Sequence, residues 1–532
     1  MTPKKTGAAA IACGLALTMS LSMGFASTAS AATVTFDKDL QSQTVSNRTF
    51  IAYKLATVKT TDGTTTYTFV SDGIRTAIKG ILTDLGVADV DKADTDVAIS
   101  GLIAGLDNSK KVEFASKIAD KAPGMAPSTT INGNSGALDD FGYYVITETT
   151  AGSVVKAAPF LLETSDKDVT TTLKSSQPSI GKDIVSDDKK DSKYDDVNIG
   201  DDVKFELNDM KVPDTYGYNT YKYIITDTMS TGLTLTKAQV DALTLTIGGK
   251  SVAAGDGTYT VTVNGTKAGD LAADWSAKGA TIVITFNEKY FIGTYGDVDS
   301  TTGKVSYTQT PAAGSDIKVN FSATLNDGAT VAVPESNTVK LTYTNDTDKT
   351  TDSTEHKVYV YTYGIEVDKT FSDGKDLFDK VEFGLTGDKD IYVTGSAGKY
   401  TVVTKDTAGA KPASSGLKLD ASGHIEIKGL DAGSYVLKET KVPTGYESDG
   451  PKTIVIKPNY GDEGAAGKAG QTVTVDKDTD NDGYVNGSVV NTPQTFHLPQ
   501  TGAAGVILLP LIGMGAMAGA AITLRRKAQS NN

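Results

Sequence analysis

The chain has 532 residues, of which 39% are hydrophobic and 7% aromatic, enough for several modest cores and too many for a wholly disordered protein. Its 54 glycines and 15 prolines fit neither a collagen repeat nor a Pro-rich stalk. The net charge of −14 argues against nonspecific nucleic-acid binding, the single cysteine (Cys13) excludes disulfides and Cys-ligated zinc, and the three histidines are scattered. We therefore expect no metal and no cofactor.

Residues 1–31 have the features of a secretory signal peptide. Lys4 and Lys5 form a basic start, residues 8–21 an apolar run, and residues 29–31 (Ala-Ser-Ala) a small-residue cleavage site. The apolar run is shorter than the ~20 residues that a membrane-spanning helix needs. We expect the protein to be exported and this segment to be removed.

The exported part is predicted to be built mainly from β-strands. Apolar and polar residues alternate at 281–286, 316–323, 357–363 and 453–458, and Gly, Asp and Asn cluster between such runs, as in antiparallel sandwiches. Two stretches instead have helical spacing. The first follows Ser71 and Asp72, and its apolar positions are Ile74, Ile78, Ile81, Leu82 and Leu85. The second lies near residue 115, and its apolar positions are Val112, Ala115, Ile118 and Ala119. We expect both helices to be insertions that pack on the sheet of the first domain.

Three similar segments indicate three sandwiches. GYYVITETTAG at 142–152 resembles GSYVLKETKVPTG at 433–445, and YKYIITDTMSTGL at 221–233 has the same apolar spacing. A polar stretch with Pro178 and a second boundary near 363–364 divide them. The predicted fold class is all-β, with tandem Ig-like sandwich domains at 32–175, 176–361 and 362–497.

The C-terminal end carries the pentapeptide LPQTG (Leu498, Pro499, Gln500, Thr501, Gly502), an uncharged run at 503–524 and a basic cluster at 525–527. The run can span a bilayer, and the cluster would hold its end on the cytoplasmic side. Together the three parts resemble the cell-wall sorting signal of Gram-positive surface proteins. The resemblance implies that a sortase cleaves after Thr501, passes its carbonyl to an amine and frees the tail up to residue 532. Losing both ends removes five basic residues and no acidic one, which takes the charge from −14 to −19.

The last domain places a lysine where an apolar residue is expected. Lys369 shares one strand face with Ile365 and Val367, and a lysine there is costly unless it is paired or neutral. Burial lowers the pKa of an amine and raises the pKa of a carboxyl. A neutral Lys369 could then attack the carboxamide of Asn491, at the end of the last strand, while Glu439 relays protons and ammonia leaves.

These residues resemble the Cna B-type domains of Gram-positive surface proteins, and YVLKETKVPTGY at 435–446 matches their E-box. The resemblance implies that Lys369, Glu439 and Asn491 form an isopeptide bond between the first and last strands of residues 362–497. Such a sandwich cannot be unzipped by pulling its ends.

The middle domain has a similar set with Asp in place of Glu. IGKDIV at 180–185 supplies Lys182, YIITDTM supplies Asp227, and PESNTVKLTY supplies Asn337 at the start of a final strand. This set resembles the Cna A-type variant, which implies an isopeptide bond between Lys182 and Asn337 with Asp227 as the catalytic acid.

The first domain, Cna B-like with its helical insertion, departs from this pattern. Lys38 and Glu148 match the lysine and the E-box glutamate, but no Asn occurs between residues 137 and 197. Asp166 or Asp168 could serve as the electrophile. The simpler interpretation is that no bond forms and that Glu148 hydrogen-bonds within its domain.

One acidic segment partly matches the sequence pattern of a calcium-binding loop. Residues 478–489 begin like a calcium loop, with Asp478, Asp480 and Asp482, but Val489 stands at the twelfth position, where a bidentate Glu is required. We interpret the segment as an acidic hairpin before the last strand.

The whole arrangement resembles the major shaft (backbone) pilins of sortase-assembled Gram-positive pili. It implies a secreted, cell-wall-anchored fimbrial subunit that supports adhesion, with Thr501 joined by a pilus-specific sortase to a lysine of the next identical subunit. A housekeeping sortase, minor pilins and peptidoglycan are further implied partners. No nucleophile–base set for an external substrate is found, so the protein is expected not to be an enzyme beyond forming its own bonds.

The acceptor lysine is the least specific of these predictions. Members of the family place it near the end of the first domain, commonly in a YPK motif, which this chain lacks. Lys174 is the best positional match and Lys167 the runner-up. The alternative function is a monomeric sortase-anchored adhesin or a minor pilin, which needs no acceptor.

Overall fold

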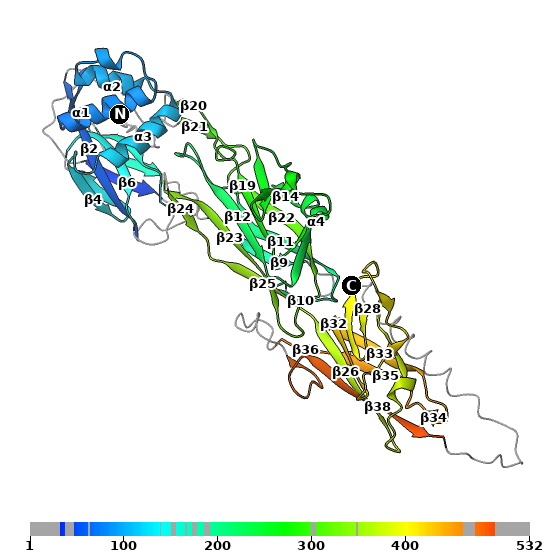
Figure 1. The fold of residues 1–532 in the computed structure, drawn as a ribbon. Helices are drawn as coiled ribbons and strands as arrows, with labels where there is room; N and C mark the ends of the chain where they lie inside the picture. Colours follow the sequence, from blue (N-terminus) through cyan, green and yellow to red (C-terminus); the bar gives the residue numbers. More distant parts are fainter. Residues whose placement is uncertain are drawn as a thin grey trace, which may run out of the picture.

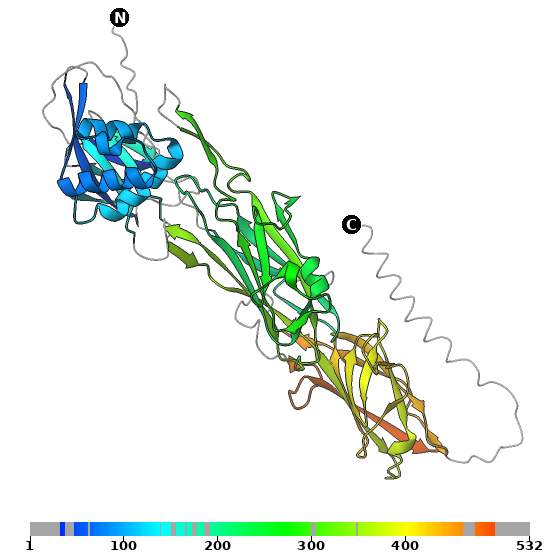
Figure 2. The same cartoon turned by 45° about the horizontal axis from the view of Figure 1, so that its top comes forward.

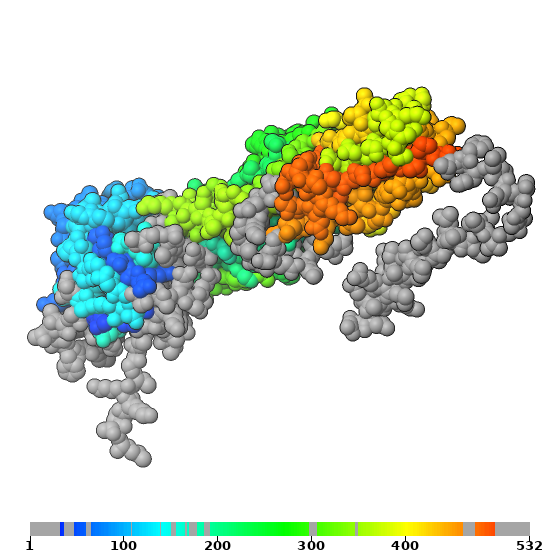
Figure 3. Space-filling model, turned by 90° about the horizontal axis from the view of Figure 1, so that it is seen from below, coloured from blue at the N-terminus to red at the C-terminus, as the bar shows by residue number. Residues whose placement is uncertain are grey.

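The computed structural model consists of three β-rich bodies that follow one another along an elongated molecule (Figure 1). The same row is seen after a 45° turn (Figure 2) and in the space-filling view from below (Figure 3). The structure describes residues 32–37, 47–61, 64–138, 140–150, 156–164, 168–172, 178–185, 192–298, 305–346, 349–460 and 474–494. Among the helices of these residues, none is both long and apolar enough to cross a membrane.

The first body has two sheets and a helical layer. The smaller sheet has the order β5-β1-β8, and the larger has the order β3-β2-β6-β7 with β4 paired to β2. Its strands are β1 (Ala32–Asp37), β2 (Thr49–Thr61), β3 (Thr64–Phe69), β4 (Ser128–Asn132), β5 (Ser135–Leu138), β6 (Gly142–Glu148), β7 (Phe160–Thr164) and β8 (Val169–Thr172). One apolar core lies between the sheets and a second lies between the larger sheet and the helices.

The helical layer contains α1 (Asp72–Asp84), the 3₁₀ turn η2 (Val90–Lys92), α2 (Asp96–Ala104) and α3 (Asn108–Lys121). The two helices expected from spacing are α1 and α3, and α1 begins after Ser71, whose hydroxyl accepts from the N–H of Ile74 at 3.2 Å. Helix α2 was not predicted. It has only nine residues, and its apolar side chains do not keep to one face, so spacing gives no signal.

The middle body is a sandwich of two large sheets. One has the order β15-β14-β22-β11-β9, with β13 and β18 attached, and the other has the order β10-β25-β23-β12-β19-β16-β17, with β24 attached. The first sheet contains β9 (Gly181–Ile184), β11 (Asp202–Lys211), β13 (Leu233–Thr236), β14 (Thr244–Ile247), β15 (Lys250–Ser251), β18 (Ser276–Lys278) and β22 (Asp316–Leu325). The second contains β10 (Tyr194–Asp196), β12 (Tyr223–Met229), β16 (Tyr259–Val263), β17 (Thr266–Lys267), β19 (Thr281–Phe286), β23 (Glu335–Asp346), β24 (Lys349–Asp352) and β25 (His356–Tyr361).

A short helix, α4 (Lys237–Asp241), a 3₁₀ turn, η3 (Ala268–Asp270), and a hairpin of β20 (Thr294–Val298) and β21 (Val305–Thr308) complete this body. The hairpin extends toward α3 of the first body (Figure 1), where Tyr295 packs on Val112. The predicted position of Asn337, at the start of the final strand of this domain, is wrong. Asn337 lies in β23, and two further strands, β24 and β25, follow β23 and pair with it.

The last body is again a two-sheet sandwich. Its sheets have the orders β30-β28-β29-β32-β26-β38-β34 and β31-β27-β33-β35. The strands are β26 (Tyr363–Phe371), β27 (Glu382–Thr386), β28 (Tyr392–Ser396), β29 (Lys399–Val403), β30 (Lys411–Pro412), β31 (Leu417–Lys418), β32 (His424–Leu430), β33 (Gly433–Lys441), β34 (Tyr446–Glu447), β35 (Lys452–Ile456) and β38 (Tyr484–Pro493). A 3₁₀ turn, η4 (Phe378–Lys380), and a small pair, β36 (Pro458–Asn459) and β37 (Thr474–Val475), complete it.

The middle and last bodies are joined almost without a linker. The run predicted at 357–363 covers β25 and the start of β26, with only Thr362 between them. The N–H of Val197 donates to Tyr361 O at 3.1 Å, and the N–H of Ile199 donates to Gly429 O at 2.9 Å. The all-β tandem architecture expected from the alternation is confirmed.

Candidate cross-linking sites

The middle sandwich buries Lys182, Asp227 and Asn337 between its two sheets. Lys182 points inward from β9, while Asp227 and Asn337 come from the neighbouring strands β12 and β23 of the facing sheet. Their exposed fractions are 0%, 1% and 0%. The Lys182 ammonium is ion-paired with Asp227 Oδ2. Asn337 stands opposite Met229, which shares the inward face of β12 with Asp227, so register alone brings the carboxyl and the carboxamide together.

The surroundings of this site favour uncharged forms. The rings of Phe205 and Phe321 lie 5.1 and 5.0 Å from Lys182 Nζ. Burial lowers the pKa of Lys182 and raises the pKa of Asp227, and their mutual attraction opposes both shifts only in part. Asp227 Oδ1 and both polar atoms of the Asn337 carboxamide make no hydrogen bond of regular geometry with any described residue. The Asn337 carboxamide is close enough to Asp227 to oppose the rise in the pKa of that carboxyl, so it lies beside the buried amine–acid pair.

The last sandwich buries a second set, with Lys369 1%, Glu439 6% and Asn491 0% exposed. Lys369 follows Ile365 and Val367 on the inward face of β26, as the alternation predicts. Strand β38 runs parallel to β26 and places Asn491 opposite Phe371, two residues beyond Lys369 on the same face. Glu439 faces them from β33 of the other sheet.

The three groups are bonded differently from those of the middle site. Lys369 Nζ donates to Thr370 O at 2.7 Å and lies 4.3 Å from the centre of the Phe371 ring. Burial lowers the pKa of Lys369 to about 8, although Glu439 opposes the shift. Glu439 Oε1 accepts from Asn491 Nδ2 at 2.7 Å, while Glu439 Oε2 and Asn491 Oδ1 have no partner within the described part of the chain. Here the acid hydrogen-bonds to the carboxamide, while the amine hydrogen-bonds to a backbone oxygen and feels the acid only through its charge.

In the first body the residue that matches the E-box glutamate is fully occupied by other groups. Glu148 Oε2 accepts from Arg48 Nη1 at 3.2 Å and from the N–H of Ala157 at 2.7 Å, and Oε1 accepts from Thr150 Oγ1 at 2.6 Å. Arg48 is 3% exposed, and a guanidinium remains protonated, so it cannot act as a nucleophile. The predicted hydrogen bonding of Glu148 within its domain is observed.

Sequence reasoning did not identify Arg48. Arg48 precedes Phe50 by two residues, and Phe50 pairs directly with Glu148 across β2 and β6, a register that the sequence alone does not give. Of the possible electrophiles, Asp168 accepts from the N–H of Thr33 at 2.7 Å, and Asp166, like Lys38, lies outside the described residues.

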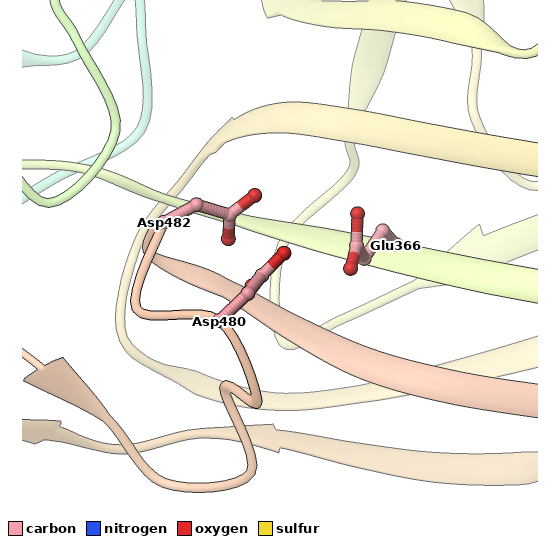
Figure 4. A group of neighbouring side chains, drawn as sticks. All are labelled: Glu366, Asp480 and Asp482. Carbon is pink, nitrogen blue, oxygen red and sulfur yellow. The ribbon is translucent and has the colours of Figure 1, made fainter.

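The acidic segment forms a tight turn in front of β38. Asp478 Oδ1 accepts from the N–H of Asn481 at 2.7 Å, and Oδ2 accepts from the N–H of Gly483 at 2.8 Å, so this carboxylate closes the turn. Asp480, Asp482 and Glu366 of β26 point toward one another, with carboxylate oxygens within 4.8 Å (Figure 4). Burial and the neighbouring carboxylates raise the pKa of Glu366 and of Asp482. Val489, at the twelfth position, is buried in β38.

Several predicted residues lie outside the part of the chain that the structure describes. They are the signal peptide, the two acceptor candidates Lys167 and Lys174, and the sorting motif Leu498, Pro499, Gln500, Thr501 and Gly502.

Comparison with known families assigns both C-terminal segments. Residues 363–468 match the prealbumin-like fold domain family (SpaA), and residues 491–532 match the LPXTG cell wall anchor motif. None of the curated proteins searched matches the chain.

Several solved structures are similar over most of the chain. The T6 backbone pilin of serotype M6 Streptococcus pyogenes shares 16% identity over 89% of this chain and 100% of that one, with a TM-score of 0.48. The major pilin SpaD from Corynebacterium diphtheriae shares 16% identity over 88% of this chain and 98% of its own, with a TM-score of 0.45. BcpA, the major pilin subunit of Bacillus cereus, shares 15% identity over 88% of this chain and 100% of its own, with a TM-score of 0.43.

The two family matches bear out the resemblance drawn from the sequence at the C-terminal end. The chain is a cell-wall-anchored surface protein with a prealbumin-like SpaA domain at residues 363–468 and an LPXTG anchor motif at residues 491–532.

Proposed function

We propose that the protein is the shaft subunit of a covalently polymerised pilus and that two of its domains close themselves with Lys–Asn isopeptide bonds. The observation that carries the proposal is the pair of buried Lys–acid–Asn sets, in two successive sandwiches of a chain with a cell-wall anchor motif. A buried lysine is costly while it carries a charge, and an amide bond to the neighbouring carboxamide would remove that charge for good.

In the last domain, neutral Lys369 Nζ attacks Cγ of Asn491. The Nζ–Cγ bond forms, the Cγ–Nδ2 bond breaks, and ammonia leaves with the proton that the amine loses. Glu439 is the proton carrier, because it contacts the carboxamide at 2.7 Å. The lowered pKa of Lys369, about 8, leaves an appreciable fraction of the amine neutral at physiological pH.

In the middle domain the same exchange of bonds joins Lys182 Nζ to Cγ of Asn337. Asp227 holds the amine directly, so it takes the proton of Lys182 and hands it to the departing nitrogen. The apolar box of Phe205 and Phe321 excludes water from the amine and favours its neutral form.

The bonds would place covalent links in the path of tension. Tension on the last domain enters at the start of β26 and leaves at the end of β38, and these strands are parallel neighbours. A bond between Lys369 and Asn491 carries that load in place of the hydrogen-bond ladder. It also restricts the unfolded chain, as a disulfide does.

Polymerisation would join the C-terminal end of one mature subunit to a lysine near the end of the first domain of the next. A pilus-specific sortase cleaves after Thr501 and joins its carbonyl to Lys174 of the next subunit, with Lys167 as the runner-up acceptor. A housekeeping sortase then attaches the base of the fibre to peptidoglycan.

A denaturing gel of cell-wall extract tests polymerisation. A ladder that survives boiling is expected; a single band would favour the monomeric adhesin. A ladder unchanged by Lys174→Ala would refute that acceptor. Intact mass tests the internal bonds, because each removes about 17 Da as ammonia.

A further inference from the structure

The nucleophile of the middle site stands on a weakly held strand. Strand β9 has only four residues, Gly181–Ile184, and it lies at the edge of its sheet, where β11 is its one ladder partner among the strands that the structure describes. Lys182 must nevertheless be held against Asn337, which belongs to the opposite sheet. A short edge strand frays easily, so its outer side needs another support.

That support comes from Ser192 and Lys193. Ser192 O accepts from the N–H of Ile184 at 2.7 Å, and Ser192 Oγ donates to Asp183 Oδ1 at 2.7 Å. Lys193 Nζ donates to the backbone oxygen of Lys182 at 2.8 Å and to Asp183 Oδ1 at 2.6 Å. A single cation thus holds both the nucleophilic residue and its neighbour.

The same residue reaches the opposite sheet. The N–H of Tyr359 in β25 donates to Lys193 O at 2.9 Å. Tyr359 follows Val358, which stands directly opposite Asn337 in the β23–β25 ladder. Lys193 therefore connects the two sides of the site. Its side chain holds the backbone of Lys182, and its carbonyl holds β25, the strand next to the one that carries Asn337.

We propose that Lys193 is a positioning residue for the middle isopeptide bond, which it serves by fixing β9 and β25 so that Lys182 Nζ meets Cγ of Asn337. This inference rests on the proposed function. Lys193 touches neither reacting atom; it acts through the backbone of Lys182. Attack geometry is sensitive to displacements of about 1 Å, so loss of the clamp should slow the reaction on the order of tenfold.

The test follows both bonds in one molecule. The full chain is made by cell-free synthesis, samples are quenched in denaturant at intervals, and the cross-linked peptides Lys182–Asn337 and Lys369–Asn491 are quantified by mass spectrometry after digestion. In Lys193→Met the first peptide should form about tenfold more slowly, and the second at the unaltered rate. Lys193→Arg, which keeps a cation, should restore much of the lost rate. Lys357→Met removes a lysine of β25 of similar exposure, 45% against 46%, and should leave both rates unchanged.

A structural contribution is measured separately. In an Asn337→Ala background, where no middle bond can form, Lys193→Met should change the melting temperature of the middle domain little. Equal rates in the unaltered chain and Lys193→Met, or equal slowing of both bonds, would overturn the positioning role while leaving the isopeptide proposal intact. Absence of both cross-linked peptides from the unaltered chain would overturn the proposed function itself.

Discussion

At the scale of single residues, the two amine sites differ in which pair of groups is already in contact. Asp227 is bound to the amine of Lys182, whereas Glu439 is bound to the carboxamide of Asn491. In both sites the proposed reaction depends on the acid, because the acid must accept a proton from the amine and give one to the departing nitrogen. Removing the acid should therefore stop the reaction without removing either reactant.

Glu439→Gln should abolish the last bond and leave the middle one in place. The intact mass should rise by about 16 Da relative to the unaltered protein, because one ammonia of about 17 Da is retained and the change of Glu to Gln removes about 1 Da. Losing a link that closes about 120 residues should cost the last domain on the order of 4–5 kcal/mol of unfolding free energy, measured by denaturant titration. Glu447→Gln, an exposed change in β34, is the matched control and should lower the mass by about 1 Da. The same small decrease for Glu439→Gln would rule out this role for the acid.

Glu163 gives the first domain a pH dependence of its own. Burial raises the pKa of Glu163 to about 7, while its hydrogen bond from Tyr67 opposes the shift. Because the folded pKa lies above the unfolded one, protonation stabilises the domain, and stability is lost as pH rises from about 4.5 to about 7. The loss should be of the order of 3 kcal/mol.

Glu163→Gln should therefore flatten the dependence of the melting temperature on pH across that window and stabilise the first domain at pH 8. Glu113→Gln removes a more exposed carboxylate of α3 and serves as the control. Parallel pH profiles for Glu163→Gln and the unaltered protein would contradict the assignment.

At the scale of elements, strand periodicity was the strongest predictor. The inward positions of Lys369 and Glu439 follow from alternation, because period two decides which face a residue occupies. Strand periodicity did not predict pairings between distant segments. Examples are the contact of Arg48 with Glu148, a hundred residues later, and the parallel pairing of β10 with β25. Such contacts depend on topology, which periodicity does not encode.

The turn before β38 offers a test at this scale. Asp478 accepts backbone N–H groups and closes the turn, whereas Asp480 lies among like charges. Asp478→Ala should destabilise the last domain by about 1 kcal/mol and speed hydrogen exchange at Gly483. Asp480→Ala should be neutral or stabilising, because it relieves repulsion with Glu366 and Asp482. The opposite ranking in thermal unfolding would refute this division of roles.

At the scale of the whole molecule, the joint between the middle and last bodies is a buried polar and aromatic network. The Tyr460 hydroxyl bonds to Asp196 of β10 and lies 2.7 Å from the Tyr363 hydroxyl, and its ring lies 4.2 Å from that of Tyr194. These contacts tie a loop of the last body to an edge strand of the middle one. We expect these contacts to restrict motion between the two bodies.

Tyr460→Phe should loosen this joint while keeping the ring in place. Amide exchange at Val197 and Ile199, whose N–H groups bond to Tyr361 O and Gly429 O, should accelerate on the order of tenfold, equivalent to about 1.4 kcal/mol. Tyr392→Phe in β28, outside this network, is the control. Unchanged exchange at both amides would show that the hydroxyl does not contribute to the coupling.

The parallel pairing of β26 with β38 has one more consequence. Lys369 and Asn491 both lie near the carboxyl ends of their strands, so the proposed bond would enclose residues 370–490 in a closed covalent ring beside the main line of the chain. A single protease cut within that ring would open it but would not sever the proposed fibre. The same would hold for residues 183–336 of the middle domain if Lys182 and Asn337 are joined, so most backbone positions of these two domains could be nicked without breaking the covalent path between subunits.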